Sequence, residues 1–179
     1  MTQVPSLVGG FLLLVACNNS SSSSGDLQSK PDSASQAISY AYTPREKPNW
    51  EMGDPKNVAF VLQALKKYET GNVDALKEDF ADSVWFAADG IQLNTTKDSL
   101  ISFLKKDWEN TKSIKIEMED WEAVHGKDNK EDWVSLWYKQ TWTGKDGKVD
   151  SLASMDDIKI ENGKIRAIDT KHRRFPEKK

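Results

Sequence analysis

The spacing of apolar residues along the chain changes once, from a helical period to a strand period. After Asp54, apolar side chains recur every three or four residues, at Val58, Val61, Leu62, Leu65 and Tyr68. Asp54 and Pro55 are a typical N-cap and first helical residue, and Gly71 is a typical C-terminal stop. The pattern therefore predicts an amphipathic helix between Asp54 and Gly71.

Two shorter helices and a strand pair are expected before residue 113. Asn72 can cap a short helix that carries Val73, Leu76 and Phe80, and Thr96 can cap a third helix. The apolar stripe of the third helix is Leu100, Ile101, Leu104 and Trp108. Between these helices, segments 84–87 and 91–94 flank Ala88-Asp89-Gly90, which is typical of two short strands joined by a turn.

From residue 113 onward, apolar and polar residues alternate. Ile114, Ile116 and Met118 predict a first strand, a polar loop follows at 125–132, and further strands are expected at 133–143, 149–161 and 165–172. Asn162-Gly163 favours a tight hairpin between the last two. Three helices with about six strands, four of them in an antiparallel meander, indicate an α+β fold.

Composition and charge exclude several classes of function. The chain has 25 basic and 28 acidic residues, and the two signs are intermixed, so no nucleic-acid partner is expected. The sequence contains no phosphate-binding glycine loop, no metal-ligand cluster and no Ser-His-Asp spacing. No cofactor or metal is therefore expected. The basic segment 171–179 is interpreted as a solvated tail, with a membrane headgroup contact as the alternative.

The N-terminal region predicts export and a tether. Residues 7–16 are almost all apolar, but a run of about ten residues is too short to cross a bilayer and is typical of a signal-peptide core. The single cysteine, Cys17, follows directly. Residues 18–47 are rich in Ser, Asn, Asp, Gln and Pro, which predicts a flexible tether. The alternative for Cys17 is a buried free thiol at the end of an apolar helix.

Leu14-Val15-Ala16-Cys17 resembles a lipobox, the processing motif of bacterial lipoproteins. The resemblance implies cleavage before Cys17, a diacylglyceryl group on its thiol and a third acyl chain on the new amino terminus. Several acyl chains anchor a protein stably where a single chain binds marginally. The expected organisation is a signal peptide at 1–16, a tether at 17–47 and one domain at 48–179. The protein is expected in the outer membrane of a double-membraned bacterium, facing the periplasm.

The domain resembles the nuclear transport factor two-like superfamily, including its SnoaL-like and steroid-isomerase-like branches. The resemblance rests on "YETGNVDALKEDFADSVWFAADG", "TTKDSLISFL" and "DDIKIENGKIRAID", and spans about 120 residues, from near Asn57 to near Pro176. It implies a cone, or cystatin-like roll: a curved antiparallel sheet wrapped around a long N-terminal helix, with a pocket at one end. The superfamily contains isomerases, dehydratases, epoxide hydrolases, transport adaptors and domains without known activity, so the fold does not decide the function.

The resemblance assigns three positions of the isomerase branch. The aspartate base corresponds to Ala88 and the oxyanion-binding tyrosine to a position near Ala64, and neither alanine can transfer a proton. The second acid corresponds to Asp156, which shares one strand face with Leu152, Ser154, Ile158 and Ile160. A carboxyl among isoleucines needs a raised pKa or a nearby donor. Asp156 is interpreted as a structural carboxylate, with a catalytic acid as the alternative.

The resemblance and the strand pattern together predict the residues that line the pocket: Tyr68, Phe86, Trp108, Asp156 and Ile158. Tyr68 is also interpretable as a core aromatic. Asp89 is interpreted as a turn residue that points away from the pocket, because a one-residue shift reverses a strand side chain.

The tryptophan-rich strand at 133–143 predicts two partly apolar faces. Trp133 and Trp137 share one face, while Val134, Leu136, Tyr138 and Trp142 share the other. One face can line the cone, and the other can form a sheet-to-sheet homodimer, with a sugar-binding aromatic platform as a further interpretation. The sequence favours a lipid-anchored, non-catalytic binding or assembly module. The alternative is a SnoaL-like isomerase or hydrolase that acts on a small apolar substrate around Asp156.

Overall fold

The computed structural model describes residues 39–45 and 49–175. The chain divides into two units at residues 43 and 44, and the fold below is that of the second unit. In the first unit, the described residues 39–43 contain no helix or strand. The predicted signal peptide and the lipobox with Cys17 lie outside the described residues.

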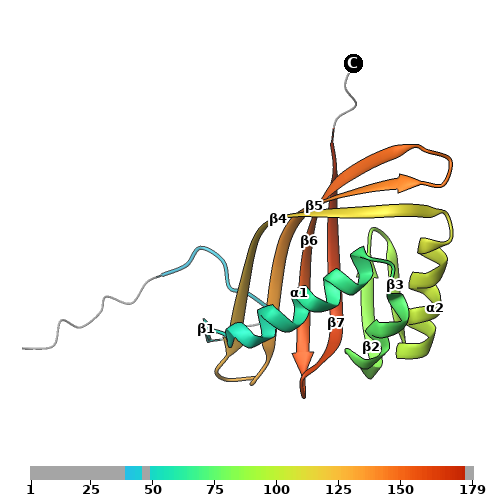
Figure 1. The fold of residues 1–179 in the computed structure, drawn as a ribbon. Helices are drawn as coiled ribbons and strands as arrows, with labels where there is room; N and C mark the ends of the chain where they lie inside the picture. Colours follow the sequence, from blue (N-terminus) through green and yellow to red (C-terminus); the bar gives the residue numbers. More distant parts are fainter. Residues whose placement is uncertain (1–38, 46–48, 176–179) are drawn as a thin grey trace, which may run out of the picture. The chain divides into compact units, whose positions relative to one another are not determined.

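The second unit is an α+β domain built on one curved sheet (Figure 1). In chain order, its described elements are β1 (Trp50–Met52), α1 (Pro55–Glu69), the 3-10 helix η1 (Val73–Glu78), β2 (Phe80–Ala88), β3 (Ile91–Thr96), α2 (Lys97–Trp108), β4 (Thr111–Gly126), β5 (Asp132–Gly144), β6 (Val149–Glu161) and β7 (Lys164–Arg174). The sheet order is β1-β4-β5-β6-β7-β2-β3. All neighbouring strands are antiparallel except β2 and β7, which are parallel.

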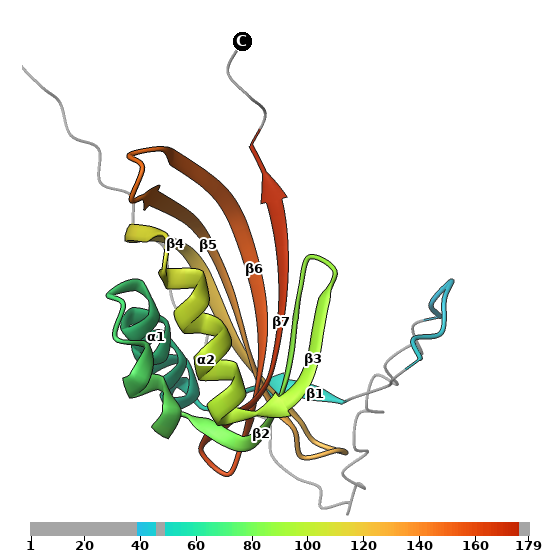
Figure 2. The same ribbon diagram turned by 90° about the vertical axis from the view of Figure 1, so that its right-hand side faces the viewer.

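The two α-helices lie on the same, concave side of the sheet (Figure 2). The Asp54 carboxylate caps α1 by accepting a hydrogen bond from the Lys56 backbone N–H at 2.9 Å, and Pro55 occupies the first helical position. The Thr96 hydroxyl caps α2 by accepting from the Ser99 N–H at 3.3 Å. Both caps fall where the sequence predicts them, since each depends on residues within a few positions of the helix start.

The hydrophobic core fills the space between the helices and the concave face of the sheet. Its largest fully buried side chains come from α1, α2, β2 and β5: Val61, Leu100, Val84, Val134 and Leu136. The two-residue period of β5 separates Val134, Leu136 and Tyr138, which are buried, from Trp133 and Trp137, which are half-buried on the convex face. The predicted division of this strand into two faces is confirmed by the burial pattern.

The predicted cone fold is confirmed, with several local corrections. The sheet has seven strands rather than about six, because the three residues of β1 pair with the end of β4. β4 extends to Gly126 and β5 begins at Asp132, so the loop expected at 125–132 is confined to 127–131. The second predicted helix is a six-residue 3-10 turn, and Phe80 instead begins β2, opposite Ile165 of β7.

The hairpin between β6 and β7 has the predicted turn. Asn162 and Gly163 both have positive φ, at 52° and 72°, as a two-residue type I′ turn requires. Within the described residues, no helix has the length and apolar character needed to cross a membrane.

Candidate ligand-binding cavity

A cavity of about 540 Å³ lies between the helices and the concave face of the sheet. Its walls are mainly apolar and include Val61 and Ala64 of α1, Phe103 of α2 and Ile158 of β6. Buried Leu76, Phe80 and Ile165 line its inner end. Exposed Asp89, Ile91 and Arg174 line its other end, which is therefore the open one. The volume is within the range of small-molecule sites in proteins.

Asp156 is a buried carboxyl that lines the cavity from the sheet. It lies on β6 with 5% of its surface exposed. Its Oδ2 accepts a hydrogen bond from the Tyr138 hydroxyl at 2.8 Å, and its Oδ1 accepts one from the Ser154 hydroxyl at 3.0 Å. The strand register explains the cluster, because Tyr138 of β5 lies directly opposite Ser154, two residues before Asp156.

Burial raises the pKa of Asp156 above its ordinary value, because the charged form loses its hydration. The hydroxyls of Tyr138, Thr170 and Ser154 favour the charged form and lower the pKa, but they offset only part of the effect of burial. Burial and the neighbouring Asp156 charge also raise the pKa of Tyr138 well above its usual range. Asp156 and Tyr138 thus form a buried acid–hydroxyl cluster that can donate or accept hydrogen bonds toward the cavity.

A second polar pair lies nearer the open end. The Nδ1 atom of His172 on β7 is 2.7 Å from Oδ2 of Asp89 in the β2–β3 turn, and both residues line the cavity. Asp89 has a φ of 40°, a left-handed conformation that aspartate tolerates better than most residues. The expectation that Asp89 points away from the pocket is wrong. That expectation assumed that the alternation of strand side chains continues to Asp89, but β2 ends at Ala88, before the turn begins.

Tyr68 lines the cavity from α1. Its hydroxyl donates to Oδ2 of Asp107 at 2.5 Å, and burial together with that carboxylate raises its pKa. The Tyr68 ring packs edge-on against Trp108, with ring centroids 6.2 Å apart. Trp108 is not among the described residues that line the cavity, because it lies behind Tyr68 and beside Gly71.

The structure brings most of the sequence-predicted residues to one place. Tyr68, Phe86, Asp156 and Ile158 all line the cavity, while Trp108 does not. Ala64 and Ala88, the positions matched to the tyrosine and the base of the isomerase branch, line it too, and both contribute only methyl groups.

The partners of Asp156 and the role of His172 were not predicted from the sequence. Tyr138 and Ser154 lie on inward-facing positions of their strands, so alternation could have paired them with Asp156. His172 lies at the end of the last predicted strand, beside the basic tail, and the strand pattern predicted no role for it in the pocket. Its partner Asp89 is 83 residues away in the chain, and no local pattern signals that contact.

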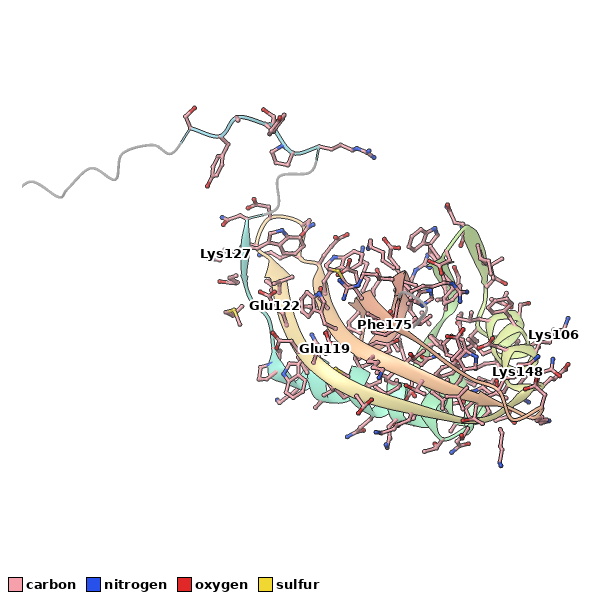
Figure 3. The ribbon with its side chains drawn as sticks, turned by 90° about the horizontal axis from the view of Figure 1, so that it is seen from above. Lys106, Glu119, Glu122, Lys127, Lys148 and Phe175 are labelled. Atoms are coloured by element: carbon pink, nitrogen blue, oxygen red, sulfur yellow. The ribbon has the colours of Figure 1, made fainter. Side chains whose placement is uncertain are left out.

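The convex face of the sheet is chemically mixed. Trp85, Trp133 and Trp137 are half-buried there. The Lys159 ammonium lies 5.8 Å from the Trp133 ring centroid. The Lys171 ammonium bonds the carboxylates of Asp157 at 2.9 Å and Asp169 at 3.0 Å. Near the sheet's end, the Lys139 ammonium lies 5.8 Å from the ring centroid of Phe175, which is labelled in Figure 3.

Across residues 39–45 and 49–175, no group of three or more His, Cys, Asp and Glu side chains is placed to hold a metal ion.

Comparison with known proteins identifies the fold. No family model matches the chain, and no curated protein matches it. Among solved structures, an LEH-like epoxide hydrolase of M. tuberculosis superposes with a TM-score of 0.56 at 9% identity, covering 66% of this chain and 83% of that one. AusH from Aspergillus nidulans gives a TM-score of 0.56 at 11% identity, covering 69% and 87% of the two chains.

A nuclear transport factor two-like protein of unknown function from Exiguobacterium sp. 255-15 has a TM-score of 0.53 at 15% identity, covering 64% of this chain and 98% of that one. At such identities the likeness defines the fold alone, which is the nuclear transport factor two-like cone.

Proposed function

We propose that the domain binds a small, mainly apolar molecule in the cavity between α1, α2 and the sheet. The observation that carries this proposal is an apolar cavity of about 540 Å³ with a hydrogen-bonded polar cluster, Asp156 with Tyr138 and Ser154, in one wall. Apolar walls with a few convergent polar groups are typical of small-molecule sites. The apolar walls provide most of the affinity, and the polar cluster fixes the orientation of the ligand.

The binding domain is proposed to be held at a membrane by a lipid anchor on Cys17. This part of the proposal rests on the lipobox-like sequence that ends at Cys17 and on the polar segment that follows it. A tether of about thirty residues lets a domain move several tens of ångströms from its anchor. The proposed location is the periplasmic side of the outer membrane.

Association of two copies through the convex face is proposed as well. Trp133 and Trp137 place aromatic surface there, and the Lys171, Asp157 and Asp169 cluster provides charges of both signs. In a two-fold dimer each copy presents the same patch, so a surface that carries both signs can complement itself. The proposed occupant of this face is a second copy of this chain.

An isomerase or hydrolase centred on Asp156 is the second candidate function. The raised pKa of a buried carboxyl in a cavity favours it, since such groups cluster at catalytic sites. The structural similarity to an epoxide hydrolase is compatible with this activity. The alanines at positions 64 and 88 favour binding over catalysis, because they leave Asp156 without the two groups of the isomerase branch.

The binding proposal is tested with the neutral fluorescent probe N-phenyl-1-naphthylamine. The full chain should bind the probe saturably. Ala64→Phe and Ala88→Phe, which fill the cavity from α1 and from β2, should each weaken binding at least tenfold. Ala59→Phe adds the same ring at an exposed position of α1 and serves as the control. Absence of saturable binding, or unchanged binding in folded filling variants, would refute the proposal.

The two functions are separated by Asp156→Asn. A positioned proton-transfer group usually contributes two to four powers of ten in rate, roughly. If the chain turns over small carbonyl or epoxide substrates and the folded Asp156→Asn variant loses that rate, the enzyme is established. If the variant binds the probe normally and the wild type turns over none of these substrates, the binding module is supported.

A further inference from the structure

Two clusters of polar side chains lie on the sheet wall of the cavity. Asp156 and its hydroxyl donors lie deep, while His172 and Asp89 lie toward the open end. The binding proposal uses only the first position. The second contains an imidazole, which can accept or donate a hydrogen bond at either ring nitrogen.

Asp89 determines which nitrogen of His172 faces a ligand as an acceptor. An ionised carboxylate only accepts hydrogen bonds, so the contact between Oδ2 and Nδ1 at 2.7 Å requires the proton on Nδ1. In the neutral ring, Nε2 then carries the free lone pair. Among the described residues, the Asp89 contact is the hydrogen bond that the His172 ring makes. Nε2 is therefore available to a hydroxyl donor in the cavity.

The strand register sets the spacing between the two positions. His172 lies directly opposite Ser154, and Asp156 is two residues farther along β6 on the same face. Diagonal neighbours of this kind in an antiparallel pair are roughly 7–8 Å apart. A ring system of one or two aromatic rings is long enough to contact both positions.

We propose that His172, oriented by Asp89, is a hydrogen-bond-accepting subsite, so that the cavity selects small apolar molecules that carry a hydroxyl group. This inference rests on the proposed binding function and specifies the ligand class. A ligand hydroxyl donates to Nε2 of His172, its ring occupies the apolar space beside Phe86 and Phe103, and its far end approaches Asp156.

The test compares probe pairs of similar size that differ in the hydroxyl proton: 2-naphthol with 2-methoxynaphthalene, and 4-phenylphenol with 4-methoxybiphenyl. Calorimetric titration uses the full chain carrying Cys17→Ser in every sample, so that no bound lipid competes. One additional hydrogen bond should favour each hydroxyl compound by about threefold to tenfold.

Variants at both members of the pair locate the effect. His172→Phe keeps a ring but removes the acceptor, and should bring the preference close to one while the methoxy compound binds as before. His172→Gln supplies a carbonyl acceptor and should retain part of the preference. Asp89→Asn tolerates the left-handed turn but no longer fixes the imidazole tautomer, and should reduce the preference. Thermal unfolding verifies that each variant is folded.

The outcomes separate this inference from the proposed function. If the wild type binds both members of each pair equally, or if His172→Phe keeps the hydroxyl preference, the subsite is refuted and the binding function stands. If the wild type binds neither these four compounds nor N-phenyl-1-naphthylamine, both the binding function and the subsite are refuted, whereas binding of N-phenyl-1-naphthylamine alone refutes only the subsite. A preference that disappears in His172→Phe and partly returns in His172→Gln supports the subsite.

Discussion

Asp156 has two hydroxyl donors within hydrogen-bond distance, and burial still raises its pKa. In the unfolded chain the same carboxyl ionises near pH 4, roughly. As the pH rises from there toward the folded-state pKa, the unfolded state binds fewer protons than the folded state, so the free energy of unfolding falls. The stabilising protonated form is thus fully present at low pH and is lost as the pH rises.

Asp156→Asn should remove this dependence, because the amide keeps the shape and an acceptor but does not ionise. Relative to the variant, the wild type should lose stability as the pH increases from about 4. Denaturant unfolding at a series of pH values measures the difference. Asp157→Asn, on the opposite face of the same strand, controls for the loss of one negative charge. Parallel stability curves for wild type and Asp156→Asn would contradict the prediction.

Tyr138→Phe should be more damaging than Tyr68→Phe. The Tyr138 hydroxyl donates a hydrogen bond to the buried carboxyl of Asp156, and removal of one partner from a buried polar group costs about 1–3 kcal/mol. The Tyr68 hydroxyl donates to Asp107, which is exposed and can bond to water instead, so the loss of the Tyr68 hydroxyl should cost less than about 1 kcal/mol. Equal free energies of unfolding for the two variants would show that Asp156 does not depend on Tyr138.

At the scale of elements, the sequence predicts what is encoded locally. The caps Asp54 and Thr96 act on residues two or three positions away, and the alternation in β5 depends on burial of one face. The edge strand β1 has three residues, all exposed, which is too short a segment to predict a strand, and its pairing with β4 defines it. The alternation of residues in β6 predicted that Asp156 faces inward, and this part of the candidate site could be predicted from the sequence. The contact between Asp89 and His172 could not be predicted, because it depends on the parallel pairing of β2 with β7.

Thr96 joins β3 to α2, and its cap is a testable feature at this scale. Its hydroxyl accepts from the Ser99 backbone N–H, which has no partner within the helix. Thr96→Ala should lower the free energy of unfolding by about 0.5–2 kcal/mol, while Thr96→Ser, which keeps the hydroxyl, should stay close to wild type. Denaturant titration measures both. A loss of the same size in the serine variant would assign the effect to the threonine methyl group.

For the whole molecule, the proposed lipid anchor determines where the domain acts. Because Cys17 is the only cysteine, Cys17→Ser should abolish incorporation of labelled palmitate and leave an unprocessed precursor of higher mass. The residues that line the cavity all fall between Val61 and Arg174, so this variant should bind N-phenyl-1-naphthylamine as the wild type does. Palmitate incorporation that persists in Cys17→Ser would refute the lipoprotein proposal.

The proposed homodimer depends on the convex face of the sheet. A stable interface should bury on the order of 1,000 Å² or more, which requires several strands to take part. Trp137 lies opposite Met155 on this face, so Trp137→Glu and Met155→Glu each place a carboxylate at the centre of the proposed contact. Since each copy contributes the same residue, every substitution acts twice across the two-fold axis.

Sedimentation velocity at micromolar concentration should show a dimer for the full chain carrying Cys17→Ser and a monomer after either glutamate substitution. Lys106→Glu on α2, away from the sheet face (Figure 3), changes charge without touching the proposed contact and should remain dimeric. Melting temperatures confirm that the variants are folded. A wild-type chain that sediments as a monomer would refute the dimer, and the half-buried tryptophans would then serve only to cover the sheet.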